Sequence, residues 1–395
     1  MALGIYISVP FCRTKCSYCN FASDVFSGAL FERYVDRVCA DIESAPQTAA
    51  QMLGQLDREV DSIYLGGGTP TLLASSQLER IFATVRRQFD VSAEAEVTVE
   101  CAPGTLTHDM IETLLRCGVN RVSLGVQSFV DQEAAAVGRL HKRASVLEDI
   151  ARLRAAGISK MNIDLIAGLP HQTAESWDFS LSEAIATGAP HASVYMLEVD
   201  EDSRLGRELL AGGARYHTHF VPDEEATADF YLSACDRLHS SGIKQYEISN
   251  FAREGHESVH NLKYWTRQPY LGFGVDAHSM LISNTPEVDA VRFAHADSLD
   301  RYVSGAPPQL TAVSHQAAFE ESFFLGLRLN RGVSLLKIGA RFGEASAENV
   351  QSIVAELVED GLMERQEDLV WLTSRGRLLS NEVFQRFILP EEVVR

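Results

Sequence analysis

The sequence contains no run of about 18 uncharged apolar residues, so it predicts no transmembrane helix. Its first residues, Met-Ala-Leu-Gly-Ile-Tyr-Ile-Ser-Val, lack the basic region and the long apolar stretch of a secretory signal peptide. Basic residues are also few, because 35 Lys and Arg stand against 54 Asp and Glu, a formal net charge of -19. Without a basic face to bind a phosphate backbone, nucleic acid is not expected as a partner. We therefore expect a cytoplasmic protein, in which thiols stay reduced.

Cysteine is scarce, and three of the seven cysteines lie within eight residues of one another, at Cys12, Cys16 and Cys19. The other four are scattered singly and are predicted to be small buried residues. A four-ligand zinc site would need a second Cys-x-x-Cys pair, which the sequence does not have. Three thiols also cannot pair evenly as disulfides. The spacing Cys-x-x-x-Cys-x-x-Cys instead favours three ligands of a [4Fe-4S] cluster, with the fourth iron left open.

Short apolar runs alternate with helical stretches before residue 200. Six runs have the pattern of strands, at 5–9, 62–65, 96–100, 121–126, 160–166 and 191–197. Helical stretches lie between them, for example at 31–42, 75–88, 107–117, 145–156 and 173–187. This alternation predicts a parallel sheet with right-handed crossovers. We expect an α/β fold, a partial (β/α)6 barrel whose functional groups gather at the C-terminal ends of its strands.

Unusual residues follow several of these predicted strands. The segment 66–70, Gly-Gly-Gly-Thr-Pro, comes directly after the second strand, and its glycines would let the backbone approach a ligand closely. A glycine turn required only for strand-to-helix geometry is the alternative interpretation. Glu100 ends the third strand, Gln127 and Ser128 follow the fourth, and Asp164 lies on the fifth. Any one of them could simply cap its strand, but the set together predicts a binding site.

These segments resemble a known family. The cysteine run, together with residues 66–70, 118–129, 138–141 and 164–170, looks like the radical S-adenosylmethionine (SAM) proteins related to oxygen-independent coproporphyrinogen III dehydrogenase. The resemblance runs essentially end to end. It implies a radical-SAM barrel with one [4Fe-4S] cluster whose open iron is chelated by SAM, which that family cleaves to a 5'-deoxyadenosyl radical. In that family the cofactor carries the chemistry, and the protein positions the reacting groups and keeps water out of the site.

The resemblance also implies a role for individual positions. The cluster would be ligated by Cys12, Cys16 and Cys19, and two aromatic rings would lie against cluster and adenine, Tyr6 and Tyr18. The methionyl end of SAM would be held by Gly67, Gly68, Thr69 and Glu100. A further SAM or substrate region would be lined by Gln127, Arg139 and Asp164. The chain departs from the family at Ala102, where an asparagine is usual, which puts the local hydrogen bonding beside Glu100 in doubt.

Two features separate the branches of this family. The dehydrogenase carries an additional cysteine two residues past the triplet, where this chain has Phe21. The segment 260–265, His-Asn-Leu-Lys-Tyr-Trp, is similar to the signature of HemW-type haem chaperones, which bind haem and pass it to acceptor proteins. That branch implies haem and haem-acceptor proteins as partners, with the cluster and SAM controlling assembly or transfer. Coproporphyrinogen III dehydrogenase is the alternative, and whether SAM is cleaved is left open.

Several histidines are candidates for the haem iron. Imidazole is a common haem ligand, so His260 is the predicted axial ligand, with His278 as the second candidate. A packed, hydrogen-bonded loop is the alternative interpretation of the signature around His260. His171 is expected at the barrel rim, and two more histidines, at 217 and 219, are expected in a loop.

The character of the chain changes beyond about residue 300. Helical spacing at 317–328, 334–341 and 347–360 precedes a predicted hairpin at 361–373, a pattern typical of a winged-helix-like module. We expect three parts, a radical SAM core barrel over 1–235, a connecting segment over 236–305 and a C-terminal helical, winged-helix-like domain over 306–395. Because the chain is acidic, the last part is interpreted as a lid or docking surface. A homodimer and transient contact with membrane-bound acceptors remain open alternatives.

Overall fold

The structure is a computed structural model that describes residues 1–388, except the side chains of residues 345, 347 and 349. In this part of the chain the main element is a 12-stranded sheet with the strand order β12-β11-β10-β9-β1-β2-β3-β4-β5-β6-β8-β7. The first six strands are β1 (Leu3–Val9), β2 (Glu59–Gly67), β3 (Asp90–Cys101), β4 (Arg121–Gln127), β5 (Lys160–Ala167) and β6 (His191–Met196). They pair in parallel and in sequence order.

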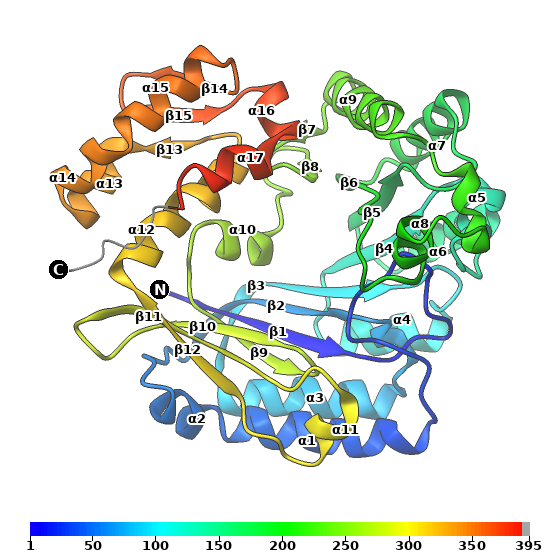
Figure 1. The fold of residues 1–395 in the computed structure, drawn as a ribbon. Helices are drawn as coiled ribbons and strands as arrows, with labels where there is room; N and C mark the ends of the chain where they lie inside the picture. Colours follow the sequence, from blue (N-terminus) through cyan, green and yellow to red (C-terminus); the bar gives the residue numbers. More distant parts are fainter. Residues whose placement is uncertain (389–395) are drawn as a thin grey trace.

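Helices connect the parallel strands, as the alternating pattern predicted. They are α1 (Ala29–Glu43), α2 (Ala45–Gln51), α3 (Ser75–Gln88), α4 (His108–Arg116), α5 (Asp131–Ala136), α6 (Arg143–Ala155) and α7 (Ala174–Ala186). After β6 come α8 (Arg204–Leu210) and α9 (Glu224–Ser240). Apolar side chains of the parallel strands and of most of these helices form one continuous core. Because the edge strands β12 and β7 do not pair with each other, the predicted partial barrel is confirmed (Figure 1).

The segment predicted as a connector, 236–305, supplies strands to both edges of the main sheet. β7 (Lys244–Gln245) and β8 (Asn250–Ala252) extend it beyond β6. The chain then crosses through α10 (Val259–Trp265) to the other edge, where β9 (Tyr270–Gly274) pairs in parallel with β1. The sheet ends with the antiparallel strands β10 (His278–Ile282), β11 (Val288–Ala294) and β12 (Gln309–Ser314), with α11 (Leu299–Val303) between the last two.

Of the part predicted at 306–395, residues 309–314 form β12 of the main sheet, whereas residues 315–388, which we call the C-terminal domain, contain helices and a small sheet with the strand order β13-β15-β14. Its elements are α12 (His315–Phe324), β13 (Val333–Ser334), α13 (Leu335–Phe342), α14 (Glu344–Asn349), α15 (Gln351–Glu359), β14 (Met363–Gln366), β15 (Leu369–Leu372), α16 (Ser374–Leu378) and α17 (Ser380–Gln385). Helices followed by a hairpin agree with the winged-helix-like prediction. Residues 389–395 of the predicted domain lie outside the described residues.

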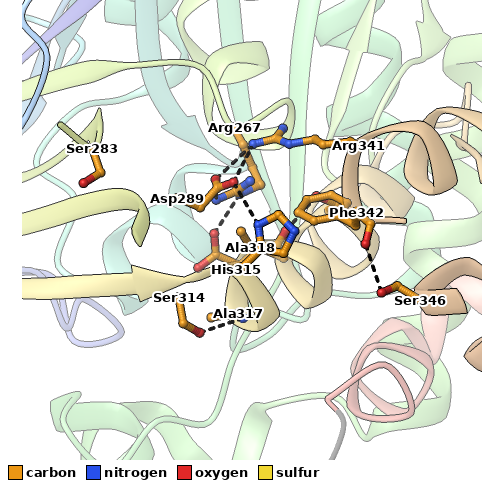
Figure 2. Close-up of polar contacts among 12 residues, drawn as sticks. Arg267, Ser283, Asp289, Ser314, His315, Ala317, Ala318, Arg341, Phe342 and Ser346 are labelled. Atoms are coloured by element: carbon orange, nitrogen blue, oxygen red, sulfur yellow. Dashed lines mark hydrogen bonds and ion pairs between the residues drawn. The ribbon is translucent and has the colours of Figure 1, made fainter. Parts of the chain in front are cut away.

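An interdomain charge network joins this domain to the main sheet, and Figure 2 shows its centre. Arg267, in the loop after α10, contacts Glu321 of α12 (Nε to Oε2, 2.8 Å) and Asp289 of β11 (Nη2 to Oδ1, 3.1 Å). Arg341 of α13 also reaches Asp289, at 2.9 Å, and Arg292 of β11 reaches Glu321, at 2.7 Å. Arg267 and Glu321 are buried, and each has a second partner, so removing one of them would leave the other buried charge with a single ion pair.

Candidate functional site

A cavity of about 940 Å³ lies at the C-terminal ends of the parallel strands, and we call it the main cavity. Parallel α/β barrels place their working groups at this end, because all the strands point the same way. The cavity brings together eleven of the thirteen residues predicted from the sequence, namely Cys12, Cys16, Tyr18, Cys19, Gly67, Gly68, Thr69, Glu100, Gln127, Arg139 and Asp164. Tyr6 and His260 are not part of its wall.

The loop after β1 carries the three thiols. Backbone hydrogen bonds hold this loop, from Cys12 N to Asp24 O (3.0 Å) and from Ser17 N to Val137 O (3.1 Å). All three cysteines are free, and burial raises the pKa of the Cys12 and Cys19 thiols. Binding as thiolates would therefore release protons. Among residues 1–388 no three potential ligands converge on one ion, whereas a cubane cluster spreads its thiolates over separate iron atoms.

The glycine segment after β2 allows close backbone packing. A Cβ atom on Gly68 would lie 2.6 Å from Phe11 O and 2.8 Å from Val9 O, and Gly67 has a φ of +95°. A Cβ atom on Gly66 would meet the Glu100 carboxylate at 2.8 Å. The segment thus passes between the cysteine loop and Glu100, where no side chain would fit.

Glu100 lies at the end of β3, inside the cavity wall. Its carboxylate accepts hydrogen bonds from Tyr64 OH (2.8 Å, to Oε1) and from Gly67 N (3.1 Å, to Oε2). Burial, and next the charge of Asp164, raise the pKa of Glu100 to about 7. This carboxyl group can therefore be charged or neutral near physiological pH, and a cationic ligand would favour the charged form.

Sequence reasoning found Asp164 but missed the polar row around it. Asp164 accepts hydrogen bonds from Ser123 Oγ (3.0 Å) and Asn162 Nδ2 (2.7 Å), and Asn162 Oδ1 bonds His191 Nδ1 at 2.7 Å. Ser193 Oγ continues the row from the neighbouring strand, at 2.9 Å from Asn162 Nδ2. The available signal was the spacing of two between the polar residues of β5, and likewise of β6, which points them to the same face.

Several buried polar atoms of the cavity wall have no hydrogen-bond partner within residues 1–388. Two of them are Gln127 Oε1 and Thr98 Oγ1. Gln127 also has a left-handed backbone, with a φ of +67°, which is uncommon for a residue other than glycine. Near it, Arg139 bonds Gly125 O and lies 3.7 Å (Nη1 to Sγ) from Cys16. Unsatisfied buried acceptors indicate that the cavity is shaped for a polar ligand.

Tyr6 and His260 lie outside the wall of the main cavity, near each other. His260 is buried on α10, where its Nδ1 bonds Ser62 Oγ (3.1 Å) and its Nε2 bonds Tyr264 OH (2.9 Å). Burial lowers the pKa of His260 to about 3, so the ring is neutral. Its ring centroid is 6.3 Å from that of Tyr6. His260 as a haem ligand stays a prediction, and it requires that a bond at one ring nitrogen break.

The residues that line the cavity fit a [4Fe-4S] cluster and SAM. Three thiols of the right spacing lie in one wall, next to a glycine segment, a buried carboxylate and two unsatisfied acceptors. The position of the additional cysteine is occupied by Phe21, whose side chain is 63% exposed at the rim. The neighbouring domain also reaches the cavity, through Arg377 and Asn381.

Comparisons with known proteins agree with this fold and this cavity. Residues 6–183 match the model of the Radical SAM superfamily, and residues 313–379 match that of the HemN C-terminal domain. A Bacillus subtilis protein named heme chaperone HemW is 35% identical, over 97% of this chain and 98% of the relative. A relative of the same name from Lactococcus lactis is 30% identical, over 98% of this chain and 97% of the relative. The structure of Escherichia coli coproporphyrinogen III oxidase (HemN) has a TM-score of 0.82 at 23% identity, over 98% of this chain and 90% of that one.

The open parallel sheet and the three-cysteine cavity define a radical SAM protein. The likeness to HemN shows the shared fold and nothing finer. At 35% identity over nearly the full length of both chains, the chain belongs to the HemW family of haem chaperones. The resemblance inferred from the sequence is therefore confirmed.

Proposed function

We propose that this chain binds haem and passes it to acceptor proteins, while a [4Fe-4S] cluster and SAM in the main cavity control assembly or transfer. The observation that carries the proposal is the match to proteins named heme chaperones, which extends over nearly the full length of this chain and of those proteins. The exposed side chain of Phe21, where the dehydrogenase has a further cysteine, also supports it.

The residues of the main cavity would divide the work of holding the cofactors. Cys12, Cys16 and Cys19 would bind three irons, and Glu100 with the backbone of the glycine segment would hold the polar groups of SAM. When bound, a reduced cluster can supply an electron that cleaves the sulfonium of SAM. The chain itself would orient SAM, exclude water and place a charge or a proton at Glu100, since the pKa of this group lies near 7.

Cytoplasmic localisation and haem-acceptor partners belong to the same proposal. Within residues 1–388, no helix is both long and apolar enough to cross a bilayer. The candidate haem ligand His278 is exposed and lies 3.7 Å from Asp276 (Nε2 to Oδ1), outside the main cavity.

The proposal is tested with anaerobically reconstituted protein. Ferric haem is titrated into it and followed by absorbance, and the loaded protein is then mixed with an apo-haem protein that can be separated from it. We expect stoichiometric binding and release of haem to the acceptor. A chain that does not bind haem contradicts the proposal, and steady conversion of coproporphyrinogen III with SAM and reductant favours the dehydrogenase instead.

A matched pair of variants tests the cluster. Cys16→Ala should lose most of the iron and sulfide, because one of three ligands is missing. Cys39→Ala, in a half-buried thiol on α1 outside the cavity, should keep both. Equal iron content in the two variants would contradict the cluster assignment.

A further inference from the structure

A second cavity, of about 450 Å³, lies beside the cysteine loop, and we call it the outer pocket. Its wall includes Lys15, Arg204, Tyr216, His217 and Phe220, and also His219 as a second histidine. Lys15 also lines the main cavity, and Ser17, which follows Cys16, forms part of the outer pocket's wall. The two cavities therefore share the loop that carries the predicted cluster ligands.

A pair of histidines gives the outer pocket an imidazole that is oriented to bind a metal ion. His217 Nδ1 lies 3.1 Å from His171 Nε2, and His217 Nε2 makes no hydrogen bond within the described part of the chain. The ring of His171 stacks on Phe220, with a centroid distance of 4.2 Å, and His171 N donates to Phe220 O at 2.8 Å. Imidazoles that ligate metals generally donate their other ring N–H to an acceptor, which fixes the tautomer and raises basicity. His171 stands in the place of that acceptor.

The backbone at these histidines is held in an uncommon conformation. His171 has a φ of +69°, and two consecutive residues, Tyr216 and His217, have φ values of +56° and +60°. Residues other than glycine rarely adopt left-handed conformations, and those that do cluster at functional sites. Here the conformation places the half-exposed ring of Tyr216 and the exposed ring of His217 in the wall of the outer pocket, and His171 lies against His217.

Two cations complete the outer pocket. The Arg204 guanidinium makes no hydrogen bond or ion pair within residues 1–388, although its helix is anchored to the cysteine loop by Leu205 N donating to Ser17 O (2.7 Å). Lys15 Nζ donates only to a backbone carbonyl, Phe21 O, at 3.1 Å. Both cations are therefore available to carboxylates of a ligand.

We propose that the outer pocket binds haem, with His217 Nε2 as the iron ligand and His171 as the residue that positions it. Haem combines an iron that takes imidazole, a flat apolar ring and two carboxylates, and the pocket offers a partner for each. Tyr216 and Phe220 pack against the ring, and Arg204 and Lys15 pair with the carboxylates. This inference rests on the proposed function and assigns its cargo site.

The location explains how the cluster could influence the cargo. Ser17 lies between Cys16 and Cys19, so cluster binding fixes the wall of the outer pocket and the anchor of α8. The opening to solvent also suits a protein that must release haem to a partner. We expect cluster-free protein to bind haem less tightly than cluster-loaded protein.

The test compares ferric haem binding by reconstituted wild type and single variants, followed by absorbance and electron paramagnetic resonance. His217→Ala should weaken binding at least tenfold and remove the signature of an imidazole ligand. His171→Ala should weaken it about tenfold, as removal of an outer-shell partner does. His239→Ala, in an exposed histidine of α9, should match wild type. Because these side chains are exposed or half-exposed, circular dichroism should report an unchanged fold.

The outcomes separate this inference from the function it rests on. Wild type that binds no haem overturns both. Equal haem binding by wild type and by His217→Ala overturns the outer-pocket site alone. Loss of haem binding only in His219→Ala, or only in His260→Ala, does the same. A rescue experiment adds a second readout. In His217→Gly, free imidazole can occupy the space left by the side chain, so adding it should restore the absorbance of the haem-loaded protein. No restoration would argue against ligation by His217.

Discussion

The His260→Ala variant provides the sharpest test of what the signature at 260–265 does. In the structure the His260 ring is buried, with both nitrogens in hydrogen bonds to hydroxyl groups. We therefore expect its removal to destabilise the fold, whether or not haem is present. The expectation opposes a simple ligand role, in which removal would affect haem binding and leave folding unchanged.

The expected loss follows from these contacts. The variant leaves the hydroxyls of Ser62 and Tyr264 without their partner, at about 1–3 kcal/mol for each buried group left unsatisfied. It also opens a cavity where the ring stacks on Tyr64, at a centroid distance of 5.5 Å. Together these terms lower the free energy of unfolding by about 3–5 kcal/mol.

The pH dependence gives the expectation a second signature. Burial lowers the pKa of His260 from 6.5 to about 3, so the folded protein keeps this ring neutral where the unfolded chain protonates it. Its contribution to stability is therefore present above pH 6.5 and is lost as the pH falls toward 3. The slope is at most about 1.4 kcal/mol per pH unit. His260→Ala should lack this part of the slope.

Urea denaturation, followed by circular dichroism at pH 5 and pH 8, measures both effects. His239→Ala serves as the matched control, because an exposed histidine should change the free energy of unfolding by less than about 0.5 kcal/mol. A His260→Ala protein that is as stable as wild type at both pH values, yet loses haem, would refute the reasoning and support direct ligation by His260.

Three further predictions test other parts of the chain. Gly68→Ala should lower the iron content of reconstituted protein more than twofold, because its Cβ would lie 2.6 Å from Phe11 O, whereas Gly28→Ala meets no atom within 4 Å and should keep full iron. Glu100→Gln should remove a loss of stability that wild type shows as the pH rises from 4.5 to about 7, since the folded-state pKa is raised by burial. Denaturation at pH 5 and pH 8 measures it, and an unchanged slope would contradict that pKa. Arg267→Ala should lower the free energy of unfolding in urea by about 1.5–3 kcal/mol, because buried Glu321 loses one of its two arginine partners and keeps only Arg292. Arg301→Ala, in an exposed ion pair, should lower it by less than about 1 kcal/mol. Equal effects would show that the interdomain charge network contributes little.

The sequence predicted the barrel and most of the main cavity because local patterns encode both. Strand residues alternate with helices at regular intervals, and side chains at the C-terminal strand ends meet once the strands run in parallel. Glu100, Gln127 and Asp164 could therefore be placed together without coordinates. The spacing of the three cysteines likewise predicted that the loop after β1 brings their thiols together.

Contacts between distant segments were not predictable in this way. The pairing of β9 with β1 joins residues 270–274 to residues 4–8, and no local pattern specifies such a partner. The same holds for His171 and His217, which lie 46 positions apart and meet only because two loops with left-handed residues face each other. His260 was predicted as a haem ligand, with a packed, hydrogen-bonded loop as the alternative, and no local pattern indicated that its ring bonds Ser62 and Tyr264 in the interior.

The apolar core of the C-terminal domain has a consequence for synthesis of the chain. That core contains Met280, Ala290 and Val313 from the main sheet, packed with residues that lie between 318 and 387. On the ribosome, the sheet residues emerge first and must wait for the last part of the chain, for about 4–14 s at 5–20 residues per second. During that interval an apolar part of the sheet surface is exposed to solvent. A ribosome that stalls late would therefore leave a nascent chain prone to aggregation.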